Sequence, residues 1–411
     1  MKMKRKILVI IRGFEKSLYF LRLNKALRPF NYQCIFVVDH FNSYIYLKYN
    51  RCNVYLVRNL KKENRNKIDY PDKDIKNTVE YYMDIYSLSD LKKIYLNMFF
   101  LLEEINKKEH LDYIFFWNGT SIFDLAGKCI AKKYNIKTIF FEIANIPNKV
   151  FVDKLGTNAY SELYHNKSIL NNFNVEEKEY YSWKQSYLRN KLKHHIIPQS
   201  KKSNKEIKMN YFNIIIVLCA VFLREIGYDY KNLKNKIKKR IKLLNKKNII
   251  YKYDVVDYKL MKYIFFPLQV SNDSQILIHS DISLMDAILY AIKEAKEKNL
   301  ELIIKPHPAE HNQEIFNEIC KLKEKHKFYF INDNTFKLIK YAKKVITINS
   351  TVGLEAKICG KEVEILGRAF YKNFTEEDLR RYILGYLVNI DYFSDKEISK
   401  EAIKELEKRM Y

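Results

Sequence analysis

The sequence lacks the paired cysteines that mark a zinc site. Its cysteines form no CxxC pair and have no Cys/His spacing that suits zinc. All six are scattered singly, at Cys34, Cys52, Cys129, Cys219, Cys320 and Cys359. They are therefore interpreted as buried thiols in a reducing compartment.

A hydrophobic run long enough to cross a membrane is missing as well. The apolar run at 212–223 has twelve residues, whereas a spanning helix needs roughly 20. We interpret it as a buried helix, with a helix that dips into a membrane as the alternative. The apolar run at 7–11 is shorter than the core of a signal peptide and is followed by no small-residue cleavage site. It therefore predicts a first β-strand, and a cytoplasmic location is expected.

Acidic residues are scarce relative to basic ones. The chain has 48 Asp and Glu against 74 Lys and Arg, a formal net charge of +26. One interpretation is a solvated basic surface, since Lys, Asn, Ile and Tyr are over-used together. The other is attraction to an anionic partner: nucleic acid, an anionic membrane leaflet or a nucleotide-linked acidic sugar. Nucleic acid is disfavoured because no recognition-helix, OB or RRM signature is present.

The length of 411 residues suits two domains. Short apolar runs alternate with helix-like segments in both halves, which predicts an α/β protein with mostly parallel, doubly wound sheets. The predicted strands are 7–11, 34–38, 54–57, 113–117, 137–142, 263–266, 301–304, 328–331, 344–348 and 362–366. The predicted helices include 14–27, 88–105, 121–133, 284–298, 310–325, 336–342 and 351–359.

A basic segment without a clear strand series separates the halves. Its stretch 231–247 has nine basic residues in seventeen and an apolar residue every third or fourth position, which predicts a basic amphipathic helix. This helix could be packed on a domain and solvated, or could contact an anionic membrane surface. The predicted organisation is an N-terminal lobe (1–160), a connecting region (161–260) and a C-terminal lobe (261–411), with a cleft between the lobes.

Three strand ends in the second half carry small, polar or basic residues, and such edges present ligand sites in α/β sheets. Lys305 and His307 follow one strand, and Pro306 and Pro308 force the chain out of the sheet there. Both basic side chains could donate to phosphate oxygens, although a plain loop is the alternative. Polar residues of the loop after 263–266 could meet the sugar or the base: Gln269, Asp273, His279 and Ser280.

The third strand end opens a helix. Asn349, Ser350 and Thr351 precede it, Ser350 or Thr351 is the expected N-cap, and Glu355 lies just inside. Such a helix N-terminus binds anions well. The alternative is an ordinary capping box with Gly353 in the first turn. The three strand ends together predict a pocket for a phosphorylated ligand and favour a nucleotide-sugar transferase.

In the first half, Glu142 ends a predicted strand and Asp153 lies eleven residues further on. A glycosyl transfer needs a carboxylate that accepts the proton of the acceptor hydroxyl, and retention of configuration usually needs a nucleophile as well. The alternative is a carboxylate that caps the next element. Two further strand ends, Arg12-Gly13 and Asn118-Gly119, are interpreted as turns or acceptor contacts.

Motifs in both halves resemble a known family. They lie at 265–276 (FFPLQVSNDSQI), 279–280 (HS), 305–308 (KPHP), 347–354 (TINSTVGL) and 366–371 (LGRAFY). Weaker matches are at 19–23 (YFLRL), 141–142 (FE) and 153–158 (DKLGTN). With these motifs the chain resembles the bacterial capsular polysaccharide synthesis proteins of the KpsS/KpsC type, the β-Kdo glycosyltransferases, and most closely their KpsS-like single-module members.

The resemblance implies a GT-B fold and a CMP-sugar donor. By it, His307 and Pro308 hold the nucleotide and Ser350 and Thr351 its phosphate. Glu142 would be the acid/base and Asp153 the nucleophile of a retaining reaction, with Asn158 on the acceptor side or in a structural turn. No metal or other cofactor is implied, because no DxD stands at a strand end.

The implied reaction transfers Kdo, or a related acidic sugar, to a lipid-linked acceptor at the anionic inner-membrane leaflet. The protein would be cytoplasmic and peripheral on that membrane, with other capsule synthesis or export proteins as further partners. The family's acid-Gly pair is Glu142-Ile143 here and the Arg that follows it is absent, which leaves the acceptor and sugar open. The alternatives are a transferase with a UDP-sugar or polyol-phosphate donor, and a non-catalytic capsule assembly or export factor.

Overall fold

The computed structural model describes residues 4–57, 71–193, 251–271 and 273–411. These residues form two compact units. Unit 1 comprises the described residues up to Glu162 together with Leu387–Tyr411, and unit 2 comprises the described residues from Leu163 to Tyr386. The predicted helices at 212–223 and 231–247 lie outside the described residues.

Unit 1 is built on a six-stranded sheet with the order β3-β2-β1-β4-β5-β6. The first five strands are parallel, and β6 runs antiparallel to β5. The strands are β1 (Arg5–Ile11), β2 (Tyr32–Val38), β3 (Asn53–Leu56), β4 (Tyr113–Trp117), β5 (Lys137–Ile143) and β6 (Val150–Asp153). The central strands are apolar on both faces, as expected for parallel strands covered by helices on both sides.

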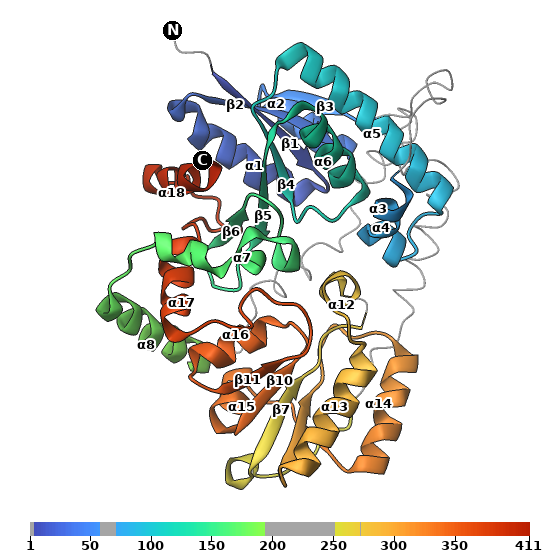
Figure 1. Cartoon of the computed structure of the whole chain (residues 1–411), viewed down its shortest axis with the longest axis vertical. Coiled ribbons are helices and arrows are strands. Elements are labelled where there is room, and N and C mark those ends of the chain that lie inside the picture. Colours follow the sequence, from blue (N-terminus) through green and yellow to red (C-terminus); the bar gives the residue numbers. More distant parts are fainter. Residues whose placement is uncertain (1–3, 58–70, 194–250, 272) are drawn as a thin grey trace. The chain divides into compact units, whose positions relative to one another are not determined.

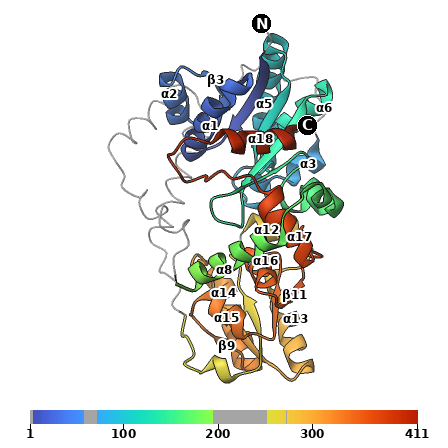
Figure 2. The same cartoon turned by 90° about the vertical axis from the view of Figure 1, so that its left-hand side faces the viewer.

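Helices cover both faces of this sheet (Figure 1). They are α1 (Phe14–Leu27), α2 (Phe41–Tyr49), α3 (Asp72–Lys76), α4 (Val79–Tyr82), α5 (Leu88–Glu109), α6 (Ile122–Tyr134) and α18 (Lys400–Met410). Alternate residues of β1 face opposite cores: Val9 packs with α1 and α18, and Ile10 packs with α5 and α6. Figure 2 shows α18 beside α1, and the two helices are in contact.

Unit 2 contains a five-stranded, wholly parallel sheet with the order β11-β10-β7-β8-β9. Its strands are β7 (Tyr263–Pro267), β8 (Glu301–Lys305), β9 (Tyr329–Phe330), β10 (Lys344–Thr347) and β11 (Glu362–Ile365). Its helices are α8 (Glu177–Lys193), α12 (Ser274–His279), α13 (Leu284–Glu297), α14 (Gln313–His326), α15 (Thr335–Tyr341), α16 (Thr351–Ile358) and α17 (Glu376–Arg380). The core with α13 and α14 lies on one face, and the core with α15 and α16 on the other.

Short helical turns complete the two units. They are Arg28–Phe30, Asn158–Tyr160, Lys167–Asn172 and Tyr258–Leu260, a π-helical turn at Arg381–Tyr386, and α7 (Glu162–His165), which follows the last strand of unit 1.

The parallel strands of the two sheets have the same topology. Numbered along the chain within each unit, the parallel strands have the order 3-2-1-4-5 in both. The direction of winding therefore reverses between β1 and β4 in unit 1 and between β7 and β10 in unit 2. Open α/β sheets bind ligands at the carboxyl ends of the strands beside such a reversal. The predicted α/β class with two Rossmann-like lobes is confirmed, and the cleft between them stays a prediction.

The C-terminal segment groups differently from the sequence-based division. Residues 387–411, assigned above to the C-terminal lobe, belong to unit 1. Val388 pairs with Val150 of β6, and α18 buries Ile403 and Leu406 in the unit 1 core. In addition, helix 310–325 begins later than predicted, at Gln313, so Glu310 lies in a loop. No helix in the described part of the chain is long and apolar enough to cross a membrane.

Candidate functional site

The carboxyl edge of the unit 2 sheet carries four neighbouring loops. They follow β10, β7, β8 and β9, which are adjacent in that order, and adjacent strands lie about 4.8 Å apart. The predicted nucleotide-sugar residues lie at the end of β8, in the loops after β7, β8 and β10, or in the short helices α12 and α16 that two of these loops open. The fold therefore gathers at one edge residues that are up to about 80 positions apart in sequence.

Gln269 and Asn349 join the loops after β7 and β10. Gln269 Nε2 donates to Asn349 Oδ1 (3.0 Å), and the Asn349 backbone N–H donates to Gln269 Oε1 (3.2 Å). Asn349 Nδ2 donates to the carbonyl oxygens of Gln275 (2.7 Å) and His279 (3.0 Å). Both side chains are buried. They hold the two loops and α12 together, and their predicted contact with a ligand stays a prediction.

His279 and Ser280 end α12. The His279 carbonyl oxygen accepts from Asn349 and from the Arg368 backbone N–H. The residue is 2 % exposed, and burial, followed by the charge of Arg368, lowers the pKa of His279 to about 4. Ser280 Oγ donates to the Ile282 carbonyl oxygen and accepts from the Ile282 N–H. These bonds explain how the end of α12 is fixed.

Lys305 is the last residue of β8, so the chain leaves the sheet at the two prolines as predicted. Its ammonium donates to the Asp333 carbonyl oxygen (2.7 Å) and to Thr335 Oγ1 (2.9 Å). Burial lowers the pKa of Lys305. The side chain thus joins the loop after β8 to the loop after β9, in addition to any contact it makes with a phosphate.

His307 has a defined ring tautomer. The Ala309 backbone N–H donates to His307 Nδ1 (3.1 Å), and because an amide N–H can only donate, Nδ1 carries no proton. Burial lowers the pKa of His307, against the opposing charges of Asp273 and Glu310, so the ring is neutral near pH 7. The remaining proton is then on Nε2, which makes that nitrogen a hydrogen-bond donor.

Ser350 is the N-cap of α16, one of the two predicted caps. Its Oγ accepts from the Val352 N–H (3.2 Å), and its carbonyl oxygen accepts from the Tyr371 hydroxyl. Thr351 is exposed at the first turn. Asp273 is likewise an N-cap, since Oδ1 accepts from the Gln275 N–H.

Glu355 has no part in capping α16, which corrects the capping-box alternative. It accepts from Tyr187 Oη (3.3 Å) and Lys191 Nζ (2.9 Å), both of α8. Glu355 is therefore a contact between α16 and α8.

In unit 1 the structure brings Glu142, Asn118 and Asn158 together at the ends of β4 and β5. Asn158 Nδ2 donates to Glu142 Oε2 (2.9 Å). The Asn118 carbonyl oxygen accepts from Thr157 Oγ1 (3.1 Å). Gly119 has a φ of 78°, and a Cβ there would lie 2.5 Å from the Phe140 ring, so this turn requires glycine.

Asp153 lies diagonally across the β5–β6 pair from Glu142. Phe140 is opposite Asp153 and Glu142 is opposite Phe151, so both carboxylates are on one face, with a diagonal spacing of about 7–8 Å. Asp153 is 2 % exposed, and its Oδ1 accepts from the N–H groups of Leu155, Gly156 and Glu162 (2.8–3.2 Å). These three bonds hold the following turn.

Arg12 and Gly13 form a structural turn after β1. The Arg12 guanidinium pairs with Asp39 (3.4 Å) and with the fully buried Glu80, and lies over the Phe123 ring. The Gly13 N–H donates to Asp39 Oδ1 (3.3 Å). Although burial acts to raise it, contacts with His40 and Arg12 hold the pKa of Asp39 at about 2. This network favours the structural interpretation of the turn over acceptor binding.

Sequence reasoning missed residues that hold the strand-end loops, two in unit 2 and one in unit 1. Glu310 joins the loops after β7 and β8, and Thr335 Oγ1 accepts a hydrogen bond from the Lys305 ammonium. In unit 1, Asp39 forms an ion pair with Arg12. A carboxylate three residues after His307 was a signal for Glu310, but the helical pattern of 310–325 obscured it. Among the described residues no group of His, Cys, Asp and Glu is arranged to hold a metal ion.

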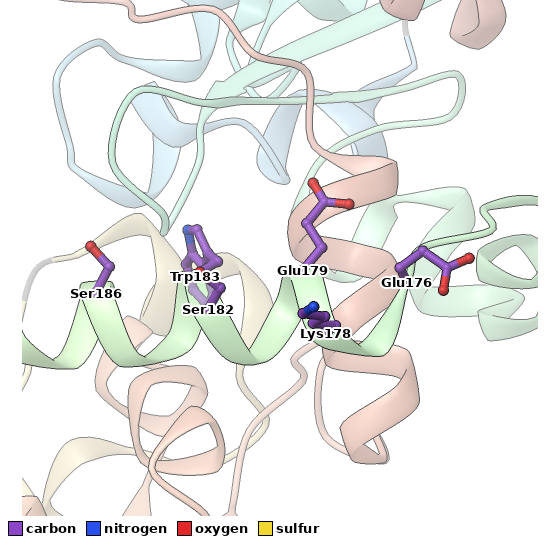
Figure 3. Close-up of a pocket in the computed structure, with 6 residues that line it drawn as sticks. All are labelled: Glu176, Lys178, Glu179, Ser182, Trp183 and Ser186. Atoms are coloured by element: carbon purple, nitrogen blue, oxygen red, sulfur yellow. The ribbon is translucent and has the colours of Figure 1, made fainter.

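One surface hollow lies along α8 (Figure 3). It is lined by Glu176, Lys178, Glu179, Ser182, Trp183 and Ser186. None of the sequence-predicted site residues is among them, so this hollow is separate from the strand-end loops described above.

Comparison with known proteins identifies relatives. A family model described as "Capsule polysaccharide biosynthesis protein" matches residues 112–374, more than half of the chain. The "Capsule polysaccharide export protein KpsS" of Escherichia coli is 31 % identical over 120 residues, which are 27 % of this chain and 31 % of that protein. "Protein FixF" of Sinorhizobium fredii is 32 % identical over 153 residues, 31 % of this chain and 37 % of that protein. The match thus spans about a third of each relative's length.

Among solved structures, two from Thermosulfurimonas dismutans are similar at low identity. The "KpsC, beta Kdo 2,7 transferase" is 18 % identical, with 79 % of this chain and 97 % of that chain covered and a TM-score of 0.38. The "KpsC, beta Kdo 2,4 transferase" is 15 % identical, with 72 % and 86 % covered and a TM-score of 0.41.

Proposed function

The chain belongs to the capsule polysaccharide biosynthesis family, and from that premise we propose that it is a glycosyltransferase. It transfers Kdo, or a related acidic sugar, from a CMP-sugar to a lipid-linked acceptor, with retention of configuration. The observation that carries this proposal is the edge of unit 2, where His307 presents an Nε2–H donor in a loop two strands away from the N-terminus of α16.

In this proposal, His307 and the N-terminus of α16 bind the CMP part of the sugar donor. The neutral His307 ring donates to a phosphate oxygen of CMP, and the α16 N-terminus, with Ser350 and Thr351, contributes N–H groups and hydroxyls to the same anion. These donors stabilise the charge on CMP as it leaves, in place of a metal ion. The motifs at 305–308 and 347–354 support the choice of CMP.

The reacting end uses the carboxylate pair of unit 1. Asp153 Oδ2 attacks the anomeric carbon while the bond from that carbon to the CMP phosphate breaks, which releases CMP and leaves a glycosyl ester. The acceptor oxygen then displaces Asp153, and Glu142 takes the proton of the acceptor hydroxyl. Asn158, bonded to Glu142, orients that base.

The acceptor is lipid-linked in this proposal, and the enzyme works at the anionic inner leaflet. The net charge of +26 supports that location, because each basic residue near an anionic surface contributes about 1 kcal/mol. Other capsule synthesis or export proteins are the expected partners. No cofactor besides the CMP-sugar co-substrate is needed.

A second candidate is a non-catalytic capsule assembly or export factor. The observation that favours it is Asp153, which is 2 % exposed and accepts three backbone hydrogen bonds. The curated relative of Escherichia coli also has export in its name. Such a factor would keep the nucleotide-binding edge without turnover.

The test of the donor assignment is thermal stability during titration with CMP and with UDP, since a ligand that binds the folded state raises Tm. We expect CMP to raise Tm and the rise to be much smaller in His307→Ala at the same CMP concentration, because binding is weakened but still measurable. The matched control is His326→Ala, at the C-terminal end of α14, which should keep the rise in Tm. A rise with UDP alone would reject the CMP-sugar donor but keep a transferase. No rise with either nucleotide would contradict the proposed function.

A further inference from the structure

Glu310 is a buried carboxylate between two loops of the unit 2 edge. It is 6 % exposed. Its Oε2 accepts from the Ser271 N–H (2.7 Å), and its Oε1 accepts from the N–H groups of His311 (2.8 Å) and Asn312 (2.7 Å) and from Ser271 Oγ (3.2 Å). Four donors from two loops thus converge on one side chain.

The same residue fixes the loop of His307. The Glu310 backbone N–H donates to the His307 carbonyl oxygen (3.1 Å), and the Ala309 N–H donates to the His307 ring. Residues 307–312 are therefore a compact turn whose far end is held by the Glu310 carboxylate. Among the described residues no Lys or Arg pairs with Glu310, so the donors that compensate its charge are those of the two loops.

Glu310 completes a series of side-chain contacts across the edge. Gln269 and Asn349 join the loops after β7 and β10, and Lys305 joins the loops after β8 and β9. The Glu310–Ser271 contact joins the loops after β7 and β8. Apart from the bond of the Leu268 N–H to the Lys305 carbonyl oxygen at the ends of β7 and β8, Glu310 therefore supplies the hydrogen bonds that join the described residues of the His307 loop to those of the loop after β7.

We propose that Glu310 is a positioning residue, which holds the His307 loop so that His307 Nε2–H and the N-terminus of α16 can bind one anionic group, the phosphate of a nucleotide. This inference rests on the proposed function, since it assigns a role within the same site. Glu310 itself does not contact the ligand; it acts through His307.

Glu310→Gln tests the role with little change in side-chain size. The amide keeps one acceptor oxygen but points an NH2 group at N–H donors, so at least one contact with Ser271 or with His311 and Asn312 is lost. Amide hydrogen exchange of the full chain without ligand should become about tenfold faster at Ser271, His311 and Asn312. Unchanged exchange at these three amides would overturn the inference, whatever the nucleotide results are.

CMP affinity measured by calorimetry gives the readout that a purely structural residue would not change. We expect Glu310→Gln to weaken CMP binding about tenfold, which corresponds to about 1.4 kcal/mol. In a His307→Ala background the same substitution should weaken it no further, because Glu310 acts through His307. Equal weakening in both backgrounds, or none in the wild-type background, would reject the positioning role.

The control is Asp378→Asn, another buried carboxylate of unit 2. Asp378 accepts from the Thr375 N–H (2.8 Å), Thr375 Oγ1 (2.9 Å) and Lys167 Nζ (2.8 Å) but lies on α17, outside the four loops. The Asp378→Asn variant should be less stable than the wild-type protein and should bind CMP with unchanged affinity. A wild-type protein that binds neither CMP nor UDP would instead reject the proposed function, while the exchange result would still decide whether Glu310 holds the loop.

Discussion

Replacing Asn349 by aspartate removes one nitrogen from the centre of the unit 2 edge. The new side chain has almost the same shape and keeps the oxygen that accepts from Gln269 Nε2. It loses the two donors to the carbonyl oxygens of Gln275 and His279 and turns a carboxylate oxygen toward both. The change therefore isolates those two hydrogen bonds.

The expected loss follows from the burial of these groups. Asn349 is 9 % exposed, and a buried acceptor that loses its donor costs about 1–3 kcal/mol. The Gln275 carbonyl oxygen loses its side-chain donor, and the His279 carbonyl oxygen keeps the Arg368 N–H. Because the new carboxylate also turns a negative charge toward both oxygens, we expect a decrease of about 3 kcal/mol in the unfolding free energy of unit 2. A loss of that size is a large fraction of the stability of an ordinary domain.

The two tryptophans allow unit 2 to be followed alone. Trp117 is in unit 1 and Trp183 is on α8 of unit 2, so a Trp117→Phe background leaves Trp183 as the fluorescent probe. Urea unfolding of Asn349→Asp in this background should show the loss. Asn317→Asp, on the exposed side of α14 with its acceptor oxygen kept for Gln313, is the matched control. A loss below about 1 kcal/mol for Asn349→Asp would refute the reasoning.

Two further predictions concern the carboxylate pair and His279. Glu142→Gln and Asp153→Asn should each lower turnover of CMP-Kdo by about 100-fold or more while the CMP-induced rise in Tm remains; the exposed Glu104→Gln is the control, and full turnover in both variants would favour the assembly factor. The lowered pKa of His279, about 4 against an ordinary 6.5, means that the unfolded state binds a proton below pH 6.5 which the folded state does not. Stability of unit 2 should therefore be retained above pH 6.5 and fall by about 3 kcal/mol as the pH approaches 4. Urea unfolding followed by Trp183 measures this fall; His279→Gln should reduce it, and an equal fall in the variant would assign it to other groups.

The fold was predictable because its strands correspond to short apolar runs in the sequence. Strands buried on both faces need no alternation, and each run such as 113–117 or 263–266 is followed by a helix-like pattern. The place of the C-terminal segment was not predictable. The apolar positions of α18 predict an amphipathic helix, but they carry no information about which of two cores that helix covers.

The sequence predicted where the candidate site lies, but it did not predict which residues contact a ligand and which hold a loop. Polar residues after apolar strands identified the edge that carries Lys305, His307 and Asn349. A sequence does not tell whether a polar side chain at such an edge faces a ligand or a neighbouring loop, because the same hydrogen-bonding groups serve both purposes. Glu355 shows the difference: it was predicted among the nucleotide-sugar residues, and the structure shows its contact with Lys191 of α8, while its contact with a ligand stays a prediction.

Since several edge residues hold loops, loss of function alone does not identify ligand contacts in this protein. A variant of Asn349 or Lys305 should lower stability and nucleotide affinity together, because the hydrogen bonds it breaks fix the loops. A variant of His307 should lower affinity with little change in stability, because the ring accepts only one local hydrogen bond among the described residues and its Nε2–H is the proposed ligand donor. The ratio of the two effects, measured on the same samples, therefore separates residues that bind the nucleotide from residues that position the loops around it.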